Sequence, residues 1–200
     1  MAQVKTMSRG GSRLYVDHDT GVKLPSVTSV VGMLPKPYLT FWASKLTAEY
    51  AVDNLPAITS ISERDREGAV DFLKRAPSRY TASRADVGSK AHDAFELLIR
   101  GERIGRVDPD IRMHVRHFEE FLDAVNPELV YAEDIAWSES VNGREDLGYA
   151  GSFDGIVRIW VREENGRPVP TPDRSGEPVL LVVDWKTGKS TYPDVALQLT

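Results

Sequence analysis

Hydrophobic residues recur every three or four positions through much of the first two thirds of the chain, a spacing typical of amphipathic helices. The pattern predicts four helices, which begin near Leu39, Ser60, Ser83 and Asp108. Gly101 and Pro127 are expected to follow the last two of them, because glycine and proline commonly end helices. Ahead of the helices, the residues predict a short strand at 13–16, a turn, and an extended segment at 22–31.

After Pro127 the pattern changes to runs rich in Val, Ile, Tyr and Trp, which are typical of strands. Three strands are predicted, over residues 129–138, 147–161 and 179–187. Residues 162–178, rich in proline and charge, are expected to form an exposed hairpin loop, and Pro193 is expected to open a last helix. Helices followed by strands predict an α+β fold in which helices cover a sheet.

The composition excludes several kinds of chemistry. The 200 residues include no cysteine, which rules out disulfides, Cys-ligated zinc, iron–sulfur clusters and thiol catalysis. There is no long apolar run to span a membrane and no apolar signal segment near the N-terminus. We therefore expect no membrane partner and a location in the cytoplasm.

The net charge of −5 conceals a gradient along the chain. Residues 64–116 carry 12 basic and 9 acidic side chains, whereas residues 117–200 carry 7 and 16. One interpretation is a phosphate-facing surface next to a carboxylate cluster that holds cations; the other is a solvated surface without a partner.

Asp184 and Lys186 are the first residues that point to specific chemistry. They end an apolar strand, and because side chains alternate along a strand, both project to one side while Trp185 points away. Burying such a pair is costly, so we expect it at a wet, polar edge of the fold. A plain surface ion pair would produce the same pattern.

A second acid, Asp154, lies in the preceding strand. If strands 149–161 and 177–187 pair antiparallel with residue numbers summing to 338, Asp154 faces Asp184. Two opposed carboxylates repel each other unless a cation lies between them, and oxygen ligands favour Mg²⁺ or Mn²⁺ over Zn²⁺. The alternative for Asp154 is an ordinary turn with Gly155.

The third candidate is His92, on a predicted helix. Glu96 lies one turn later on the same helix face, and Gly88 lies one turn earlier, where it favours close approach of a backbone or a ligand. A surface or core histidine without a ligand is the alternative.

Taken together, these residues resemble the motifs of the PD-(D/E)XK nuclease superfamily, and within it the RecB-like exonucleases of bacteria and phages. The matches follow the family's order over about residues 85–200: Gly88-Ser89-Lys90-Ala91-His92 for G-x-x-x-H, Gly151-Ser152-Phe153-Asp154 for G-x-x-D, Asp184-Trp185-Lys186-Thr187-Gly188 for D-x-K-T-G, and Gln198 for the Q of Q-x-x-x-Y. The N-terminal segment Leu24-Pro25-Ser26-Val27-Thr28 is similar to the leader of phage-encoded members.

The resemblance implies a fold. It predicts a restriction-endonuclease-like core over residues 81–200, made of a helix, a three-stranded mainly antiparallel sheet and a further helix. Residues 1–80 would form a leader of strands and extra N-terminal helices packed on that core. The family's tyrosine would fall at position 202, so we expect the core to be incomplete at the C-terminus.

The resemblance also implies a function: a Mg²⁺- or Mn²⁺-dependent exonuclease that hydrolyses DNA in recombination or DNA processing, with a recombination or helicase protein as a further partner. His92, Asp154, Asp184 and the Trp185 carbonyl would bind the metal. Lys186 would orient or deprotonate the attacking water and stabilise charge on the phosphate, and Gln198 would position Lys186. Without cysteine, the chain belongs with relatives that lack an iron–sulfur cluster.

Two other functions are compatible with the sequence. A non-catalytic DNA-binding or regulatory module on the nuclease fold is one, although such modules are expected to lose one of the acids or the lysine. A small-molecule metallohydrolase is the other, but it has no use for the basic residues Arg75, Arg79, Arg84 and Lys90, which are candidates for contact with a DNA backbone. The sequence leaves the oligomeric state open.

Overall fold

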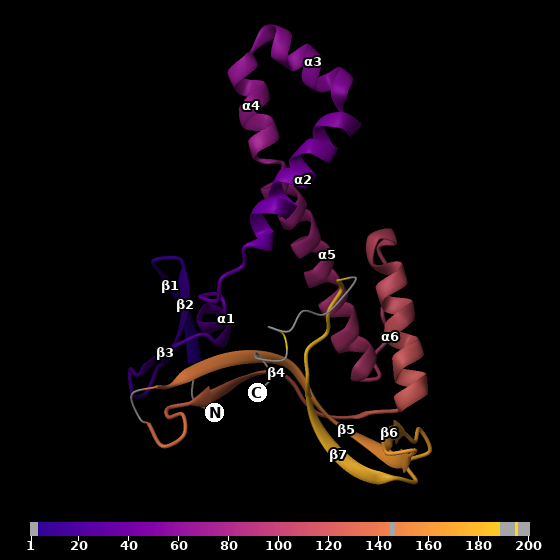
Figure 1. The fold of residues 1–200 in the computed structure, drawn as a ribbon. Coiled ribbons are helices and arrows are strands. Elements are labelled where there is room, and N and C mark those ends of the chain that lie inside the picture. The colour runs from indigo at the N-terminus through magenta and orange to yellow at the C-terminus, as the bar shows by residue number, and fades with distance from the viewer. Residues whose placement is uncertain (1–3, 145–146, 189–194, 196–200) are drawn as a thin grey trace. The chain divides into compact units, whose positions relative to one another are not determined.

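The computed structural model describes residues 4–144, 147–188 and 195 of the chain (Figure 1). The fold is mixed α+β with antiparallel sheets, as predicted. The chain divides into two compact units, Met1–Leu34 together with Lys90–Thr200, and Pro35–Ser89. This division differs from the predicted leader of residues 1–80, because the residues up to Leu34 belong to the same unit as the core. None of the helices among the described residues has the length and apolar character needed to cross a membrane.

The N-terminal segment forms a small sheet followed by a short helix: β1 (Val4–Arg9), β2 (Ser12–Asp17), β3 (Lys23–Pro25) and α1 (Val27–Val31). Strand β1 was not predicted; it pairs with β2 through a turn at Gly10 and Gly11, which both have positive φ. The predicted extended segment over 22–31 is wrong from residue 27 onward. The Ser26 side chain accepts a hydrogen bond from the Ser29 N–H over 3.0 Å, and this cap starts a helix in spite of the β-branched residues that follow.

This N-terminal sheet is joined to the main sheet by a shared core. Tyr15, Leu24 and Ala150 are buried together, with Trp137 packed against them. Ser26 also forms a parallel bridge with Ala150. The leader up to Leu34 is therefore part of the structure that carries the candidate site.

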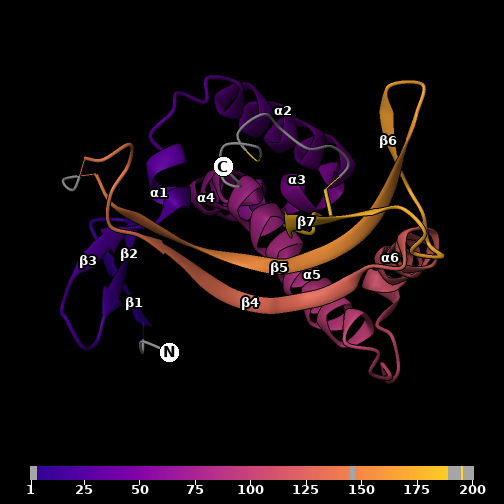
Figure 2. The same ribbon diagram turned by 90° about the horizontal axis from the view of Figure 1, so that it is seen from below.

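The main sheet consists of β4 (Glu128–Ser138), β5 (Tyr149–Glu164), β6 (Arg167–Pro170) and β7 (Glu177–Val183). Strand β5 pairs antiparallel with β4, β6 and β7. Strand β7 lies along the edge of β5 opposite to β4 and β6, because Val161 pairs with both Pro170 of β6 and Glu177 of β7, and Gly155 pairs with both Ala132 of β4 and Val183 of β7. Figure 2 shows β4 and β5 as a long, curved ribbon. The predicted loop over 162–178 is partly wrong, because Asn165 and Gly166, both with positive φ, form a tight turn that starts β6. Prolines are tolerated in β6 because it is a short edge strand.

Two helices of the same unit contact the end of the main sheet. From Lys90 onward, α5 (Ala76–Ile99) places His92 against Asp154 of β5. Helix α6 (Arg112–Val125), which follows the short 3-10 helix η1 (Pro109–Ile111), packs Phe118 on Trp185 just after β7. Gly101 follows α5 with φ 75°, as predicted for a glycine stop. The Asp108 side chain caps η1 by accepting from the Asp110 N–H. Helix α5 begins seven residues earlier than predicted, because Pro77 lies in its first turn, where no backbone donor is needed.

The second unit is helical and contains α2 (Tyr38–Asp53), α3 (Leu55–Arg64), α4 (Arg66–Lys74) and the beginning of α5. The predicted helix start at Ser60 is wrong. Asp65 has an extended backbone and its side chain accepts from the Gly68 N–H, so it separates α3 from α4 and caps the latter. Inside this unit, the Trp42 and Tyr80 rings meet edge to face at 6.1 Å.

Candidate active site

The pairing of β5 with β7 brings the two predicted acids together. Gly155 pairs with Val183 and Val161 pairs with Glu177, which is the register predicted from the sum of 338. Asp184 directly follows β7, so Asp154 and Asp184 lie opposite each other where the ladder ends. Each of the two carboxyl groups shifts the pKa of the other.

Asp154 is held by two donors from different elements. The His92 Nδ1 atom on α5 lies 3.4 Å from Asp154 Oδ1, and the Trp185 N–H donates to Asp154 Oδ2 over 2.6 Å. Burial on its own would raise the pKa of Asp154, but these two hydrogen bonds and the nearby imidazole hold that pKa below its ordinary value. The Asp154 carboxyl is therefore expected to be ionised at neutral pH.

The pKa of Asp184 is shifted in the opposite direction to that of Asp154. Burial raises the pKa of Asp184, and the neighbouring Asp154 carboxylate raises it further, while an ion pair with Lys186 opposes both. The Asp184 Oδ2 atom is shielded from solvent, and no donor among the described residues is directed at it with hydrogen-bond geometry, although the Lys186 ammonium lies against it. Two acids with opposite pKa shifts at one site are the arrangement expected when a single cation or proton must serve both.

His92 completes the group from the helix side. The hydrogen bond with Asp154 raises the pKa of His92, burial opposes this, and an interaction with the Trp185 backbone adds to the rise. Its ring is also 6.2 Å from that of Phe95 on the next turn of α5. The Asp154 carboxyl thus contacts both the His92 imidazole and the Trp185 N–H, and the Asp184 carboxylate acts on the imidazole electrostatically.

Trp185 points away from the acids, as its place between Asp184 and Lys186 predicts. Its ring packs edge to face against Phe118 at 4.9 Å and against Phe121 at 5.4 Å, both on α6. Phe118 in turn stacks on Phe95 of α5 at 4.3 Å. This aromatic cluster fixes the backbone on which Asp184 and Lys186 are carried, and ties it to the helix that carries His92.

A small cavity of about 10 Å³, room for about one water molecule or ion, lies beside Asp154 and His92. Glu96 and Glu133 also line it. Glu133 was not predicted as a site residue, because a glutamate in a strand gives no signal by itself. Its φ of 40° is unusual for a residue other than glycine, and burial, followed by the Glu96 carboxylate, raises the pKa of Glu133.

The donor set fits a hard divalent cation. Two carboxylates, one imidazole and a nearby backbone carbonyl match the ligands of Mg²⁺ or Mn²⁺, and the shielded Asp184 Oδ2 is an acceptor without a directed donor. His92 pairs directly with Asp154, and Lys186 pairs directly with Asp184. Among the described residues, no group of three or more acidic or histidine side chains is arranged so that it could hold a metal ion. Gln198, the remaining predicted site residue, lies outside the described residues.

The basic residues predicted to face DNA have partners inside the chain. Arg75 pairs with an aspartate on α4, Lys90 pairs with Asp108, and Arg79 and Arg84 lie over aromatic rings. These cations therefore stabilise the local helices, and their use in binding a phosphate backbone would compete with those contacts.

Compared with known proteins, the chain matches no family model, no curated protein and no solved structure.

Proposed function

We propose that this protein is a metal-dependent deoxyribonuclease of the PD-(D/E)XK type, similar to the RecB-like exonucleases. The observation that carries the proposal is the meeting of Asp154, Asp184, Lys186 and His92 at one edge of the main sheet. Two neighbouring carboxylates with a lysine beside them provide ligands for a cation and a positive group for a phosphate. A helix, three antiparallel strands and aromatic packing around Trp185 support a restriction-endonuclease-like core.

Each residue of the group has a distinct role in this proposal. Asp154, Asp184, His92 and the Trp185 carbonyl would hold Mg²⁺ or Mn²⁺. A bound divalent ion supplies Lewis-acid stabilisation of phosphate charge and makes hydroxide accessible near neutral pH. The Lys186 side chain is 38% exposed, so its ammonium can reach a phosphate oxygen from its position against Asp184. It would stabilise the charge that develops on the phosphate and orient the attacking water, with Gln198 helping to position it.

The proposal is tested by cleavage assays with two single variants. Asp184→Asn removes a charge from the cation ligands while keeping the side-chain shape, and Lys186→Ala removes the ammonium. Each is expected to abolish Mg²⁺- or Mn²⁺-dependent cleavage of linear DNA. Asp123→Asn, an exposed acid on α6, is the matched control and should cleave like the unaltered chain. Circular dichroism of all variants shows whether the fold is kept.

The outcomes separate the candidate functions. Cleavage that persists in EDTA, or in both Asp184→Asn and Lys186→Ala, would overturn the mechanism. DNA binding without cleavage by the unaltered chain at any Mg²⁺ or Mn²⁺ concentration would favour a non-catalytic DNA-binding module instead. Digestion of linear but not of circular duplex would identify an exonuclease, the mode expected for a role in recombination or DNA processing.

A further inference from the structure

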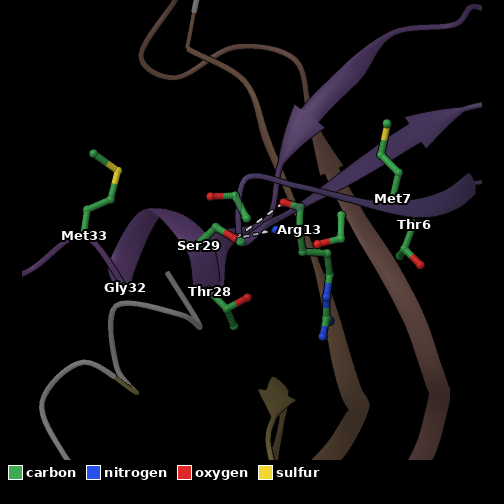
Figure 3. A pocket seen from close by; sticks show the side chains of 10 residues that line it. Thr6, Met7, Arg13, Thr28, Ser29, Gly32 and Met33 are labelled. Atoms are coloured by element: carbon green, nitrogen blue, oxygen red, sulfur yellow. Dashed lines mark hydrogen bonds between the residues drawn. The ribbon is translucent and has the colours of Figure 1, made fainter.

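A second polar site lies in the N-terminal sheet, between the β1–β2 hairpin and α1. It is an open pocket of about 710 Å³ lined by one cation, Arg13, and by the hydroxyls of Thr6, Ser8, Ser12, Thr28 and Ser29. We call it the leader pocket. Figure 3 shows the Arg13 backbone hydrogen-bonded to Ser29, with the guanidinium extending away from that contact. No carboxylate lines the pocket.

Arg13 differs from several other arginines of this unit. Four of the unit's arginines pair with an acid: Arg100, Arg116, Arg158 and Arg162. Among the residues that the structure describes, Arg13 forms no ion pair, and its side chain interacts with the Tyr15 hydroxyl. An exposed guanidinium surrounded by hydroxyl donors, with no internal anion, is suited to an external anion such as a phosphate, which it can bind through two parallel hydrogen bonds.

The leader pocket is connected to the candidate active site. The Tyr15 hydroxyl that contacts Arg13 also accepts a hydrogen bond from the Ser152 N–H over 3.2 Å, two residues before Asp154. Thr28 lines the leader pocket and also a second cavity of about 260 Å³, which Asp184 borders. The apolar residues of that cavity, among them Phe153, form walls suited to a sugar or a base.

We propose that the leader pocket binds a second phosphate of the DNA strand whose scissile phosphate lies at Asp154, Asp184 and Lys186. This rests on the proposed function, because it assumes a nucleic acid at that site. Arg13 makes the charged contact, the hydroxyls of Thr28 and its neighbours orient the phosphate, and the cavity between holds the intervening nucleotide. The leader thereby sets the position of the strand relative to the reacting phosphate.

The test measures DNA binding in EDTA, so that affinity is independent of turnover. Arg13→Gln removes the charge, and Arg167→Gln on β6, at the opposite end of β5, is the matched control with the same loss of charge. Each protein is titrated with linear duplex over a range of salt concentrations. Losing one phosphate contact should reduce the magnitude of the slope of log Kobs against log[salt] by about 0.9. Arg13→Gln should also bind about tenfold more weakly at low salt.

Further variants and substrates identify the kind of contact. Arg13→Lys should keep the salt slope but recover only part of the affinity, because an ammonium cannot form the two parallel bonds of a guanidinium. Duplexes with a 5′-phosphate and with a 5′-hydroxyl distinguish the source of the phosphate. An effect of Arg13→Gln on both indicates an internal phosphate, and an effect on the 5′-phosphorylated duplex alone indicates a terminal one.

The outcomes keep this proposal separate from the proposed function. Equal slopes and affinities for Arg13→Gln and Arg167→Gln would overturn the leader pocket as a phosphate site, whether or not the unaltered chain cleaves DNA. An Arg13-dependent slope in a chain that shows no Mn²⁺-dependent cleavage would support the phosphate site and reject the nuclease. The Arg13 backbone hydrogen bonds to Ser26 and Ser29 do not depend on its side chain, so the variants are expected to fold, as thermal unfolding will show.

Discussion

The aromatic cluster beneath the candidate site gives a prediction that can be worked from the structure. Phe118 on α6 is 5% exposed, stacks on Phe95 and meets the edge of Trp185. Phe118→Ala removes the ring that joins two helices to the segment carrying Asp184. Truncating a buried phenylalanine typically costs about 3–5 kcal/mol, and aromatic pairs add about 0.5–1.5 kcal/mol each beyond the area they bury. We therefore expect a loss in the upper half of that range.

Urea unfolding followed by far-UV circular dichroism measures this free energy. Phe118→Leu, which keeps part of the volume, should lose clearly less stability than Phe118→Ala. Met113→Ala on the same helix, at a side chain that is 55% exposed, should change stability by no more than about 0.5 kcal/mol. A loss of unfolding free energy below about 1 kcal/mol for Phe118→Ala would show that the cluster does not fix the Asp184–Lys186 segment. A cavity of this size in a well-packed core costs more than that.

Three further predictions concern charge, metal and backbone space. The hydrogen bond with Asp154 raises the pKa of His92, so the free energy that protonated His92 adds to folding should be complete below about pH 6.5 and disappear as pH rises through the folded-state pKa. In EDTA, the urea midpoint of the unaltered chain should therefore fall over this pH range relative to that of His92→Gln. Parallel pH profiles for the two proteins would contradict the pairing of His92 with Asp154. Millimolar Mg²⁺ or Mn²⁺ should raise the Tm of the unaltered chain but not that of Asp184→Asn, and an equal shift in both would place the ion elsewhere. A Cβ at Gly176 would lie 2.3 Å from the Val161 carbonyl oxygen, so Gly176→Ala should cost about 1–3 kcal/mol in urea unfolding, whereas Gly105→Ala, with open space around it, should change little.

More of the candidate site than of the architecture around it could be predicted from the sequence. The common side of Asp184 and Lys186 follows from strand alternation, which depends only on sequence spacing. The β5–β7 register was a hypothesis, chosen because it brings Asp154 and Asp184 together, and the structure has that register. The helix stop at Gly101 follows equally from local chemistry. The features that the sequence did not predict depend on single side chains or on distant partners. The cap at Ser26 turns a β-branched run into a helix, and Glu133 reaches the site only because β4 pairs with β5 there.

The division into two units was not predicted for a related reason. Amphipathic patterns show that helices have a buried face, but not which neighbour buries it. Residues up to Leu34 join the main sheet through Tyr15 and Ser26, contacts with residues more than a hundred positions away. Their effect on the site, through Ser152 and Asp154, is visible only once the chain is folded.

The distribution of cations decides how an acidic chain can bind a polyanion. With a net charge of −5, non-specific attraction to DNA is weak, so binding must depend on a few well-placed groups. Arg75, Arg79 and Arg84 are already engaged by an acid or an aromatic ring within the helical unit. Lys186 is held against one carboxylate, and Arg13 is surrounded by hydroxyls instead of acids. In the proposed function, Arg13 would therefore be the stronger anchor for a phosphate, because Lys186 would have to leave a carboxylate to reach one. The proposal thereby gives binding through the leader and chemistry at the sheet edge to different side chains.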